Sequence, residues 1–230
     1  MLDNFNDIFY LNLIKDDRWK YIVDGLAITF EVTFFSVIVG IILGFLVAIV
    51  RATHDKTGKM KALNFFCNIY LTIIRGTPLV VQLLITYFVI FGSVNVSKVV
   101  VAVIAFGVNS GAYVAEIIRG GIMSIDNGQF EAGRSIGFNH FQTMLYIIMP
   151  QVLKNVLPSL ANEFIVLLKE TSVVGYIALQ DLTKSGDIIR SQTYQATFPL
   201  LFVALIYLII VMIFSYFVKL LERRLHQDGR

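Results

Sequence analysis

Apolar residues gather into five long runs along this chain, and shorter stretches that carry charges separate them. A helix needs about 20 mostly apolar residues to cross the hydrocarbon core of a bilayer, which is roughly 30 Å thick. We therefore predict an all-α, polytopic membrane protein with about five transmembrane helices. The apolar windows are Leu26–Val50, Ala62–Phe91, Val99–Ile118, Val152–Val174 and Phe198–Val218.

The second window is too long for one straight crossing, because its 30 residues would extend about 45 Å as a helix. Its centre holds the sequence Arg75-Gly76-Thr77-Pro78. Proline has no N–H group and disfavours helix at the residue before it. We predict a lateral or interfacial helix up to Arg75 and a spanning helix after Pro78. Arg75, Thr77 and Pro78 form a candidate helix break or gate.

Two glycines in the first window predict where that helix meets a neighbour. Gly40 and Gly44 are spaced so that they lie on one helix face. Small residues at this spacing allow a second helix to approach closely, so we predict a helix-packing face there.

The N-terminal segment, residues 1–24, is polar and acidic with interspersed apolar residues. It lacks the basic start and short apolar run of a signal peptide, so we expect it to remain on the mature protein. We interpret it as an amphipathic segment at the external membrane interface. A transmembrane domain of residues 25–224 and a cytoplasmic tail of residues 225–230 follow.

Lysine and arginine in the loops predict the orientation of the chain. With five spans, 11 of these residues lie on the side of the C-terminus and seven on the side of the N-terminus. Positive residues are enriched on the cytoplasmic side of membrane proteins. We therefore place the N-terminus outside and the C-terminus in the cytoplasm.

The stretch between the third and fourth windows, residues 126–149, is too polar to cross a bilayer. Its apolar residues recur at helical spacings that Gly137 interrupts, which predicts two short helices meeting at a bend. The predicted orientation places this segment in the cytoplasm. It is either an amphipathic connector resting on lipid or a docking element for a soluble partner.

Composition excludes several other classes of protein. Hydrophobic residues make up 57% of the chain and charged residues 15%, unlike an ordinary soluble domain. The net charge of +3 comes without a basic stripe interleaved with aromatic residues, so we do not expect nucleic-acid binding. Cys67 is the only cysteine, and His54, His140 and His226 lack metal-ligand spacing. We predict no metal, no cofactor and no catalytic activity.

One motif identifies a family. The chain reads Glu131-Ala132-Gly133, three residues, Gly137, nine residues, and Ile147-Ile148-Met149-Pro150. This resembles the EAA loop of ATP-binding-cassette (ABC) importer permeases: Glu-Ala-Ala, three residues, Gly, nine residues, Ile, any residue, Leu-Pro. Gly133 replaces the second alanine and Met149 the leucine, and both replacements are conservative. Residues 74–83, 109–119 and 162–172 resemble the polar amino acid branch of that family, and the similarity extends from Gly25 to Arg224.

The resemblance implies a type I (MetI-like) importer permease fold and a permease subunit of a bacterial cell (inner) membrane. Such a subunit moves a polar amino acid into the cytoplasm by alternating access. It works with a second permease, which is a copy or a homologue, with two cytoplasmic ABC ATPase subunits and with an external solute-binding protein. The chain lacks a G-x-x-x-x-G-K-[ST] motif, which agrees with ATP hydrolysis by a partner.

In this family the EAA loop forms a coupling helix that sits in a cleft of the ATPase. The resemblance therefore assigns residues 126–149 to coupling. The carboxylate of Glu131 is expected to pair with a basic residue of the ATPase, and Gly137 is expected to supply the bend. The coupling residues are Glu131, Ala132, Gly133, Arg134, Ser135 and Gly137.

Polar residues inside the apolar windows are candidates for substrate contact, because burying them without a partner is costly. Asn109, Tyr113 and Glu116 are spaced to lie on one helix face, and Glu163 and Glu170 on another. An amino acid needs an acceptor for its ammonium group and donors for its carboxylate. The candidate substrate-binding residues are Asn109, Ser110, Tyr113, Glu116, Asn162 and Glu163.

Other interpretations stay open. The charges could be structural, with Glu116 paired to Arg119 and with Glu163 or Glu170 paired to Lys169. A single-chain, ion-coupled secondary transporter would show long internal repeats, whereas here only residues 73–76 and 117–120 are alike. A membrane scaffold or channel without an energised cycle would leave the pattern from Glu131 to Pro150 unexplained.

Overall fold

The computed structural model describes residues 4–227, and every regular element in that range is helical. Four continuous helical stretches are long and apolar enough to cross a membrane, and a sharply bent helix pair makes the number up to five. The prediction of an all-α membrane protein is therefore confirmed, with four or five candidate spans where about five were predicted. The four continuous stretches are α2 (Trp19–Thr57), α5 (Lys98–Met123), residues His140–Ile177 and α10 (Thr197–Gln227).

Helix α2 is longer than the first apolar window. Its 39 residues extend about 58 Å, far more than the thickness of a bilayer core. Residues 19–24, predicted to be part of the N-terminal segment, belong to this helix because nothing in them interrupts it. Ahead of α2 lie α1 (Phe5–Phe9), a π-helical turn (Tyr10–Ile14) and a short 3-10 turn (Lys15–Asp17).

The break in the second window is confirmed, but the predicted span after it is wrong. Helix α3 (Lys61–Gly76) is followed by α4 (Leu79–Leu84) and a π-helical turn (Ile85–Ile90), and the two halves are bent by 109°. The 12 residues after Pro78 extend only about 18 Å, too short to cross a bilayer alone. The pair therefore forms one broken span or a re-entrant loop.

The segment between the third and fourth windows differs in part from the prediction. Helix α6 (Asn127–Ser135) ends at a turn through Gly137, as expected. The next helix is not short: α7 (His140–Thr143) continues through a π-helical turn (Met144–Ile148) into α8 (Met149–Glu170) and a 3-10 turn (Thr171–Ile177). A capping box starts this helix, with hydrogen bonds from Asn139 N to Gln142 Oε1 (3.0 Å) and from Gln142 N to Asn139 Oδ1 (2.9 Å).

One helix was not predicted at all. Helix α9 (Leu182–Thr193) lies between the fourth and fifth windows, in a stretch that is too polar to form an apolar window. Buried Asp181 caps it by accepting hydrogen bonds from Thr183 N (3.0 Å) and Lys184 N (2.9 Å). Burial raises the pKa of Asp181 even though these backbone donors favour its charged form.

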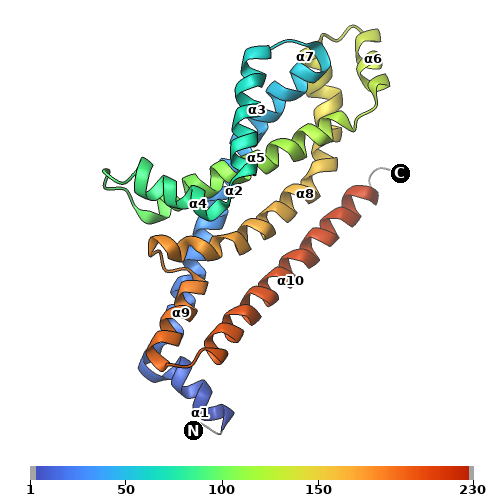
Figure 1. Ribbon diagram of the computed structural model, residues 1–230. Helices are drawn as coiled ribbons and strands as arrows, with labels where there is room; N and C mark the ends of the chain where they lie inside the picture. Colours follow the sequence, from blue (N-terminus) through green and yellow to red (C-terminus); the bar gives the residue numbers. More distant parts are fainter. Residues whose placement is uncertain (1–3, 228–230) are drawn as a thin grey trace.

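Helices α2 and α5 form the centre of the molecule, and small residues allow them to approach closely (Figure 1). A Cβ atom on Gly40 would lie 2.8 Å from Ser110 Oγ, and one on Gly44 would lie 2.6 Å from Val114 Cγ1. The predicted packing face is therefore confirmed. Helix α8 packs against α5, while α10 contacts α8 and α9 and leaves its outer side exposed.

The two ends of the molecule carry different elements. Figure 1 shows α6 at the upper end and α1 with α9 at the opposite end. Helix α10 starts beside α9 and runs toward the half of the molecule that holds α6. Asp3 and Arg230, which are predicted to lie on opposite sides of the membrane, fall outside the described residues.

Candidate functional site

The predicted polar face of α5 meets the predicted helix break. Asn109 Nδ2 donates a hydrogen bond to Gln82 Oε1 on α4 at 2.9 Å. The guanidinium carbon of Arg75 lies 5.8 Å from the centre of the Tyr113 ring, and its Nη1 lies 3.7 Å from Glu116 Oε1. Two sets of residues that were identified separately in the sequence thus form one site, which we call the helix-break site.

Gln82 is the residue of this site that sequence reasoning missed. Its Nε2 donates to Ile74 O (2.7 Å), to Thr77 O (3.1 Å) and to Thr77 Oγ1 (2.8 Å). The carboxamide therefore joins the end of α3, the start of α4 and the middle of α5. The available signal was an amide in an apolar run, four residues after the proline that breaks the helix.

Glu116 lies among three arginines. It accepts a hydrogen bond from Arg51, and its other oxygen lies 3.3 Å from Arg119 Nη2. Arg119 Nη1 also lies 3.2 Å from Asp55 Oδ2. Three guanidinium groups and two carboxylates leave this cluster with a net charge of +1. The predicted ion pair of Glu116 with Arg119 is therefore formed, and Arg51 is a partner that spacing did not reveal.

Glu163 has a different environment. Only 9% of it is exposed, and its Oε1 accepts a hydrogen bond from Ser110 Oγ at 3.0 Å. Within residues 4–227 no lysine or arginine forms an ion pair with Glu163, so the alternative pairing with Lys169 does not occur. A carboxylate that is buried with a single hydroxyl partner has strong remaining capacity to bind a cation.

The remaining polar candidates do not join these groups. The side chain of Asn162 is exposed, and Lys169 is exposed as well. The six candidate substrate-binding residues therefore divide into the helix-break face of α5, the Ser110–Glu163 pair, and Asn162, which lies apart. In the part of the chain that the structure describes, no three His, Cys, Asp or Glu side chains are arranged to hold a metal ion.

The geometry of α6 explains its glycines. Asp126 caps the start of the helix by accepting from Gly128 N (2.6 Å). At its end, Phe138 N donates to Gly133 O (3.0 Å) and Gly137 N to Arg134 O (3.0 Å), which forms a Schellman motif. Gly137 has φ = +86°, a left-handed conformation that strains any side chain with a Cβ atom.

Gly133, which stands where the family pattern has alanine, has no room for a Cβ atom without a local shift. Thr143, at the start of the next helix, occupies the space beside it. A Cβ atom on Gly133 would lie 2.6 Å from Thr143 Cγ2 and 2.7 Å from Thr143 Oγ1. Since real Cβ contacts are longer than this, an alanine here would displace the Thr143 side chain or shift the two helices relative to each other.

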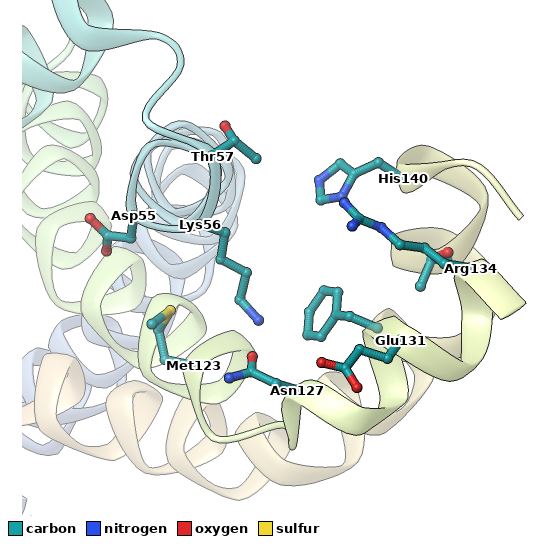
Figure 2. Close-up of a pocket in the computed structure, with 10 residues that line it drawn as sticks. Asp55, Lys56, Thr57, Met123, Asn127, Glu131, Arg134 and His140 are labelled. Atoms are coloured by element: carbon teal, nitrogen blue, oxygen red, sulfur yellow. The ribbon is translucent and has the colours of Figure 1, made fainter.

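An open cleft of about 440 Å³ separates α6 from the end of α2 (Figure 2). Lys56 extends from α2 into this cleft, and its Nζ lies 3.3 Å from the centre of the Phe130 ring on α6. Arg134 and His140 lie beside each other on the far side of the cleft, and Glu131 projects from α6. Glu131 and Arg134 are exposed, and neither forms an ion pair with another described residue.

A set of long apolar helices, a polar site at a broken helix and an exposed helical connector are typical of a membrane transport protein. Residues 36–227 match the family described as binding-protein-dependent transport system inner membrane component. The chain belongs to this family. It is a multi-pass inner-membrane permease subunit and a non-catalytic component of an ABC transport system, whose other parts include an ATPase and a binding protein.

Relatives are similar over nearly their whole length. A protein of Rickettsia typhi that carries the provisional name glutamine transport system permease protein GlnP is 40% identical over 89% of this chain and 93% of its own. The arginine transport system permease protein ArtQ of Bacillus subtilis is 36% identical over 90% and 94%. The resemblance inferred from the EAA-like pattern is therefore confirmed.

Two solved structures support the fold. The crystal structure of an amino acid ABC transporter with histidines contains a chain that is 39% identical, with a TM-score of 0.84 over 97% of this chain and 100% of that one. An inward-facing methionine ABC transporter, MetNI, has a TM-score of 0.78 at 19% identity, over 92% and 99%. The second likeness shows the fold alone and confirms the predicted type I (MetI-like) permease fold.

Proposed function

We propose that this subunit imports a polar amino acid of the glutamine, arginine and histidine class by alternating access, driven by ATP hydrolysis in partner subunits. The names of the similar permeases, and that of the amino acid ABC transporter structure with histidines, support this substrate class. A polar amino acid carries an ammonium group and a carboxylate, and its side chain adds further N–H groups. The transport path must therefore offer acceptors and donors inside the membrane.

Glu163 is the observation that carries this proposal. Its carboxylate is buried and has one hydroxyl partner, Ser110. Leaving a buried carboxylate without a countercharge is costly, and the ammonium group of a substrate would supply that countercharge. Glu116 is less available, because Arg51 and Arg119 already bind it. We therefore assign ammonium recognition to Glu163 and regard Glu116 as the centre of an ionic cluster.

The helix-break site has the chemistry of a gate. Arg75 lies at the 109° bend between α3 and α4 and reaches Glu116 on α5. A change in the bend would move Arg75 relative to α5 and break this contact of 3.7 Å. We propose that Arg75, Thr77 and Pro78 transmit motion of the broken helix to the face of α5 that carries Asn109 and Tyr113.

The same proposal gives the chain an orientation and partners. We place α6 in the cytoplasm, where it would dock on one of two ATPase subunits, and α1 outside, where the solute-binding protein would deliver substrate. The positive-inside distribution supports this orientation, as does the position of α6 and α1 at opposite ends of the fold (Figure 1). A second permease, a copy or a homologue, would complete the pathway.

Uptake by the complete transporter in proteoliposomes tests the site. We expect Glu163→Gln to raise the KM for the amino acid about 10- to 100-fold, since a hydrogen bond to a charged group contributes about 1.5–3 kcal/mol. Glu31→Gln is the matched control, because Glu31 lies on α2 with an exposed side chain and is expected to transport normally. Wild-type KM in an assembled Glu163→Gln transporter would reject Glu163 as the ammonium site.

A further inference from the structure

The bend between α3 and α4 leaves backbone carbonyls that need donors. The last carbonyls of a helix have no amide partner inside the helix, and Pro78 contributes no N–H group. Thr77 Oγ1 donates to Ile73 O at 2.8 Å. Gln82 Nε2 serves Ile74 O at 2.7 Å and Thr77 O at 3.1 Å. Both N–H groups of the Gln82 carboxamide are therefore used at the bend.

Because the Gln82 NH₂ group is bonded at the bend, Gln82 faces α5 with its carbonyl oxygen. A carboxamide has one NH₂ group and one carbonyl oxygen, so only Oε1 remains for Asn109. Asn109 consequently turns its own NH₂ group toward Gln82, at 2.9 Å, and its Oδ1 away from Gln82. Reversing Gln82 would remove both donors from the bend, so the polarity of the pair is set by the helix break.

The side-chain oxygen of Asn109 remains available as a hydrogen-bond acceptor. It is 3% exposed, and within residues 4–227 no donor bonds its Oδ1. The next residue, Ser110, bonds Glu163, and one turn later Tyr113 lies under Arg75. An unused amide oxygen on this helix is an acceptor for the N–H groups that ammonium, carboxamide, guanidinium and imidazole substituents all carry.

We propose that Gln82 is a positioning residue that determines substrate specificity. It holds the Asn109 carboxamide so that the oxygen, and not the NH₂ group, faces the substrate, and it ties that orientation to the bend between α3 and α4. The inference rests on the proposed function, because Asn109 is the neighbour on α5 of Ser110, which bonds the proposed ammonium site Glu163. Substrates that donate hydrogen bonds are favoured, and an acceptor-rich side chain such as a carboxylate is disfavoured.

Substitutions at Gln82 separate the two tasks of its carboxamide. Gln82→Met removes both the bend contacts and the partner of Asn109. Gln82→Glu removes the donors to the bend but keeps an acceptor for Asn109 Nδ2. Thr77→Val is the matched control, because it removes the hydroxyl that donates to Ile73 O and accepts from Gln82 Nε2 at the same bend, while the hydrogen bond from Asn109 to Gln82 Oε1 stays. If the only task of Gln82 were to hold the bend, all three variants would show the same changes in KM and maximal rate.

The test is uptake of glutamine, arginine, histidine and glutamate by the complete reconstituted transporter, with KM and maximal rate determined for each. We expect Gln82→Met to raise the KM for the first three about 3- to 10-fold, as for one lost hydrogen bond of about 0.5–1.5 kcal/mol, and to narrow their advantage over glutamate. Gln82→Glu is expected to recover a KM near that of the wild type. Thr77→Val should change the maximal rate and leave KM unchanged.

Asn109→Leu completes the design and replaces Gln82→Met should that variant not assemble. It is expected to raise KM by a similar factor, and Gln82→Met should add no further increase in the double variant. Wild-type KM in Gln82→Met or in Asn109→Leu would overturn the inference, as would equal KM changes in Gln82→Met and Thr77→Val. If Glu163→Gln is impaired in the same assay, only this inference fails; if Glu163→Gln is also normal, the substrate site itself fails.

Discussion

Replacing Gly137 with valine tests whether the bend after α6 transmits motion from the ATPase. Gly137 has φ = +86°, and apart from its two chain neighbours no described residue has an atom within 4 Å of the position that a Cβ atom would take, so the effect is on the backbone and not on packing. The left-handed conformation is about 1–2 kcal/mol higher in energy for a residue with a side chain, and it is higher still for a β-branched residue. This cost lowers the population of the bent form about 5- to 30-fold relative to glycine.

The structure indicates where that strain would be relieved. The two hydrogen bonds that end α6, Phe138 N to Gly133 O and Gly137 N to Arg134 O, require the left-handed turn. Losing them would release the end of α6 from Thr143, against which Gly133 packs. Because no span is altered, membrane insertion should remain normal. Association with the ATPase should weaken, or ATP hydrolysis should proceed with less transport per ATP.

The assay is the number of amino acid molecules taken up per ATP hydrolysed, together with co-purification of the ATPase. Gly58→Val is the control for strain, since Gly58 has φ = +66° at the end of α2, also in open space. Gly120→Ala is the control for adding a side chain without strain. Full coupling in an assembled Gly137→Val transporter would refute the reasoning. Equal uncoupling by Gly58→Val would show that strain anywhere near this end of the molecule is sufficient.

Three further predictions concern docking of the ATPase, the topology of the chain in the membrane and the dependence of stability on pH. Glu131→Lys should weaken co-purification of the ATPase and reduce substrate-stimulated hydrolysis, because exposed Glu131 is free to pair with a basic partner residue; normal hydrolysis and uptake would exclude this role. Single cysteines near the two ends of a Cys67→Ala chain should be labelled from opposite sides of the membrane, and labelling from one side would indicate an even number of spans. Lys184 and Arg190 hold the pKa of Asp187 below its ordinary value of 3.8, so the stability that they contribute is present above that pH and is lost as pH falls through the lowered pKa. Asp187→Asn should therefore lower the Tm at pH 7 but not in strong acid.

Local features of the sequence were sufficient to predict most helices. Long apolar runs predict spans because the backbone must satisfy its hydrogen bonds internally in lipid. Pro78 predicts a break and Gly137 a turn, because each restricts or frees its own backbone angles. These are properties of a residue and its immediate neighbours, so no tertiary contact is needed to infer them. The EAA-like spacing similarly identified the family from one short segment.

Features that depend on tertiary packing could not be predicted from local sequence patterns. Helix α9 forms in a polar stretch because buried Asp181 caps it and neighbouring helices cover it. The π-helical turn at Met144–Ile148 continues α7 into α8, although spacing suggested a short helix. The helix pair on either side of Pro78 is bent by 109°, and the helix after Pro78 is too short to be a span by itself, because the direction of a chain after a break depends on what it packs against.

The functional site shows the same division. The sequence alone determined that Asn109, Tyr113 and Glu116 lie on one face of a helix, since helical periodicity relates them. Only the tertiary structure decided that this face meets Arg75 and Gln82, and that the neighbouring Ser110 bonds Glu163. Such partners lie 27 to 53 residues apart in the chain. Their meeting depends on how each helix is rotated and on where glycines let two helices approach, which no local pattern encodes.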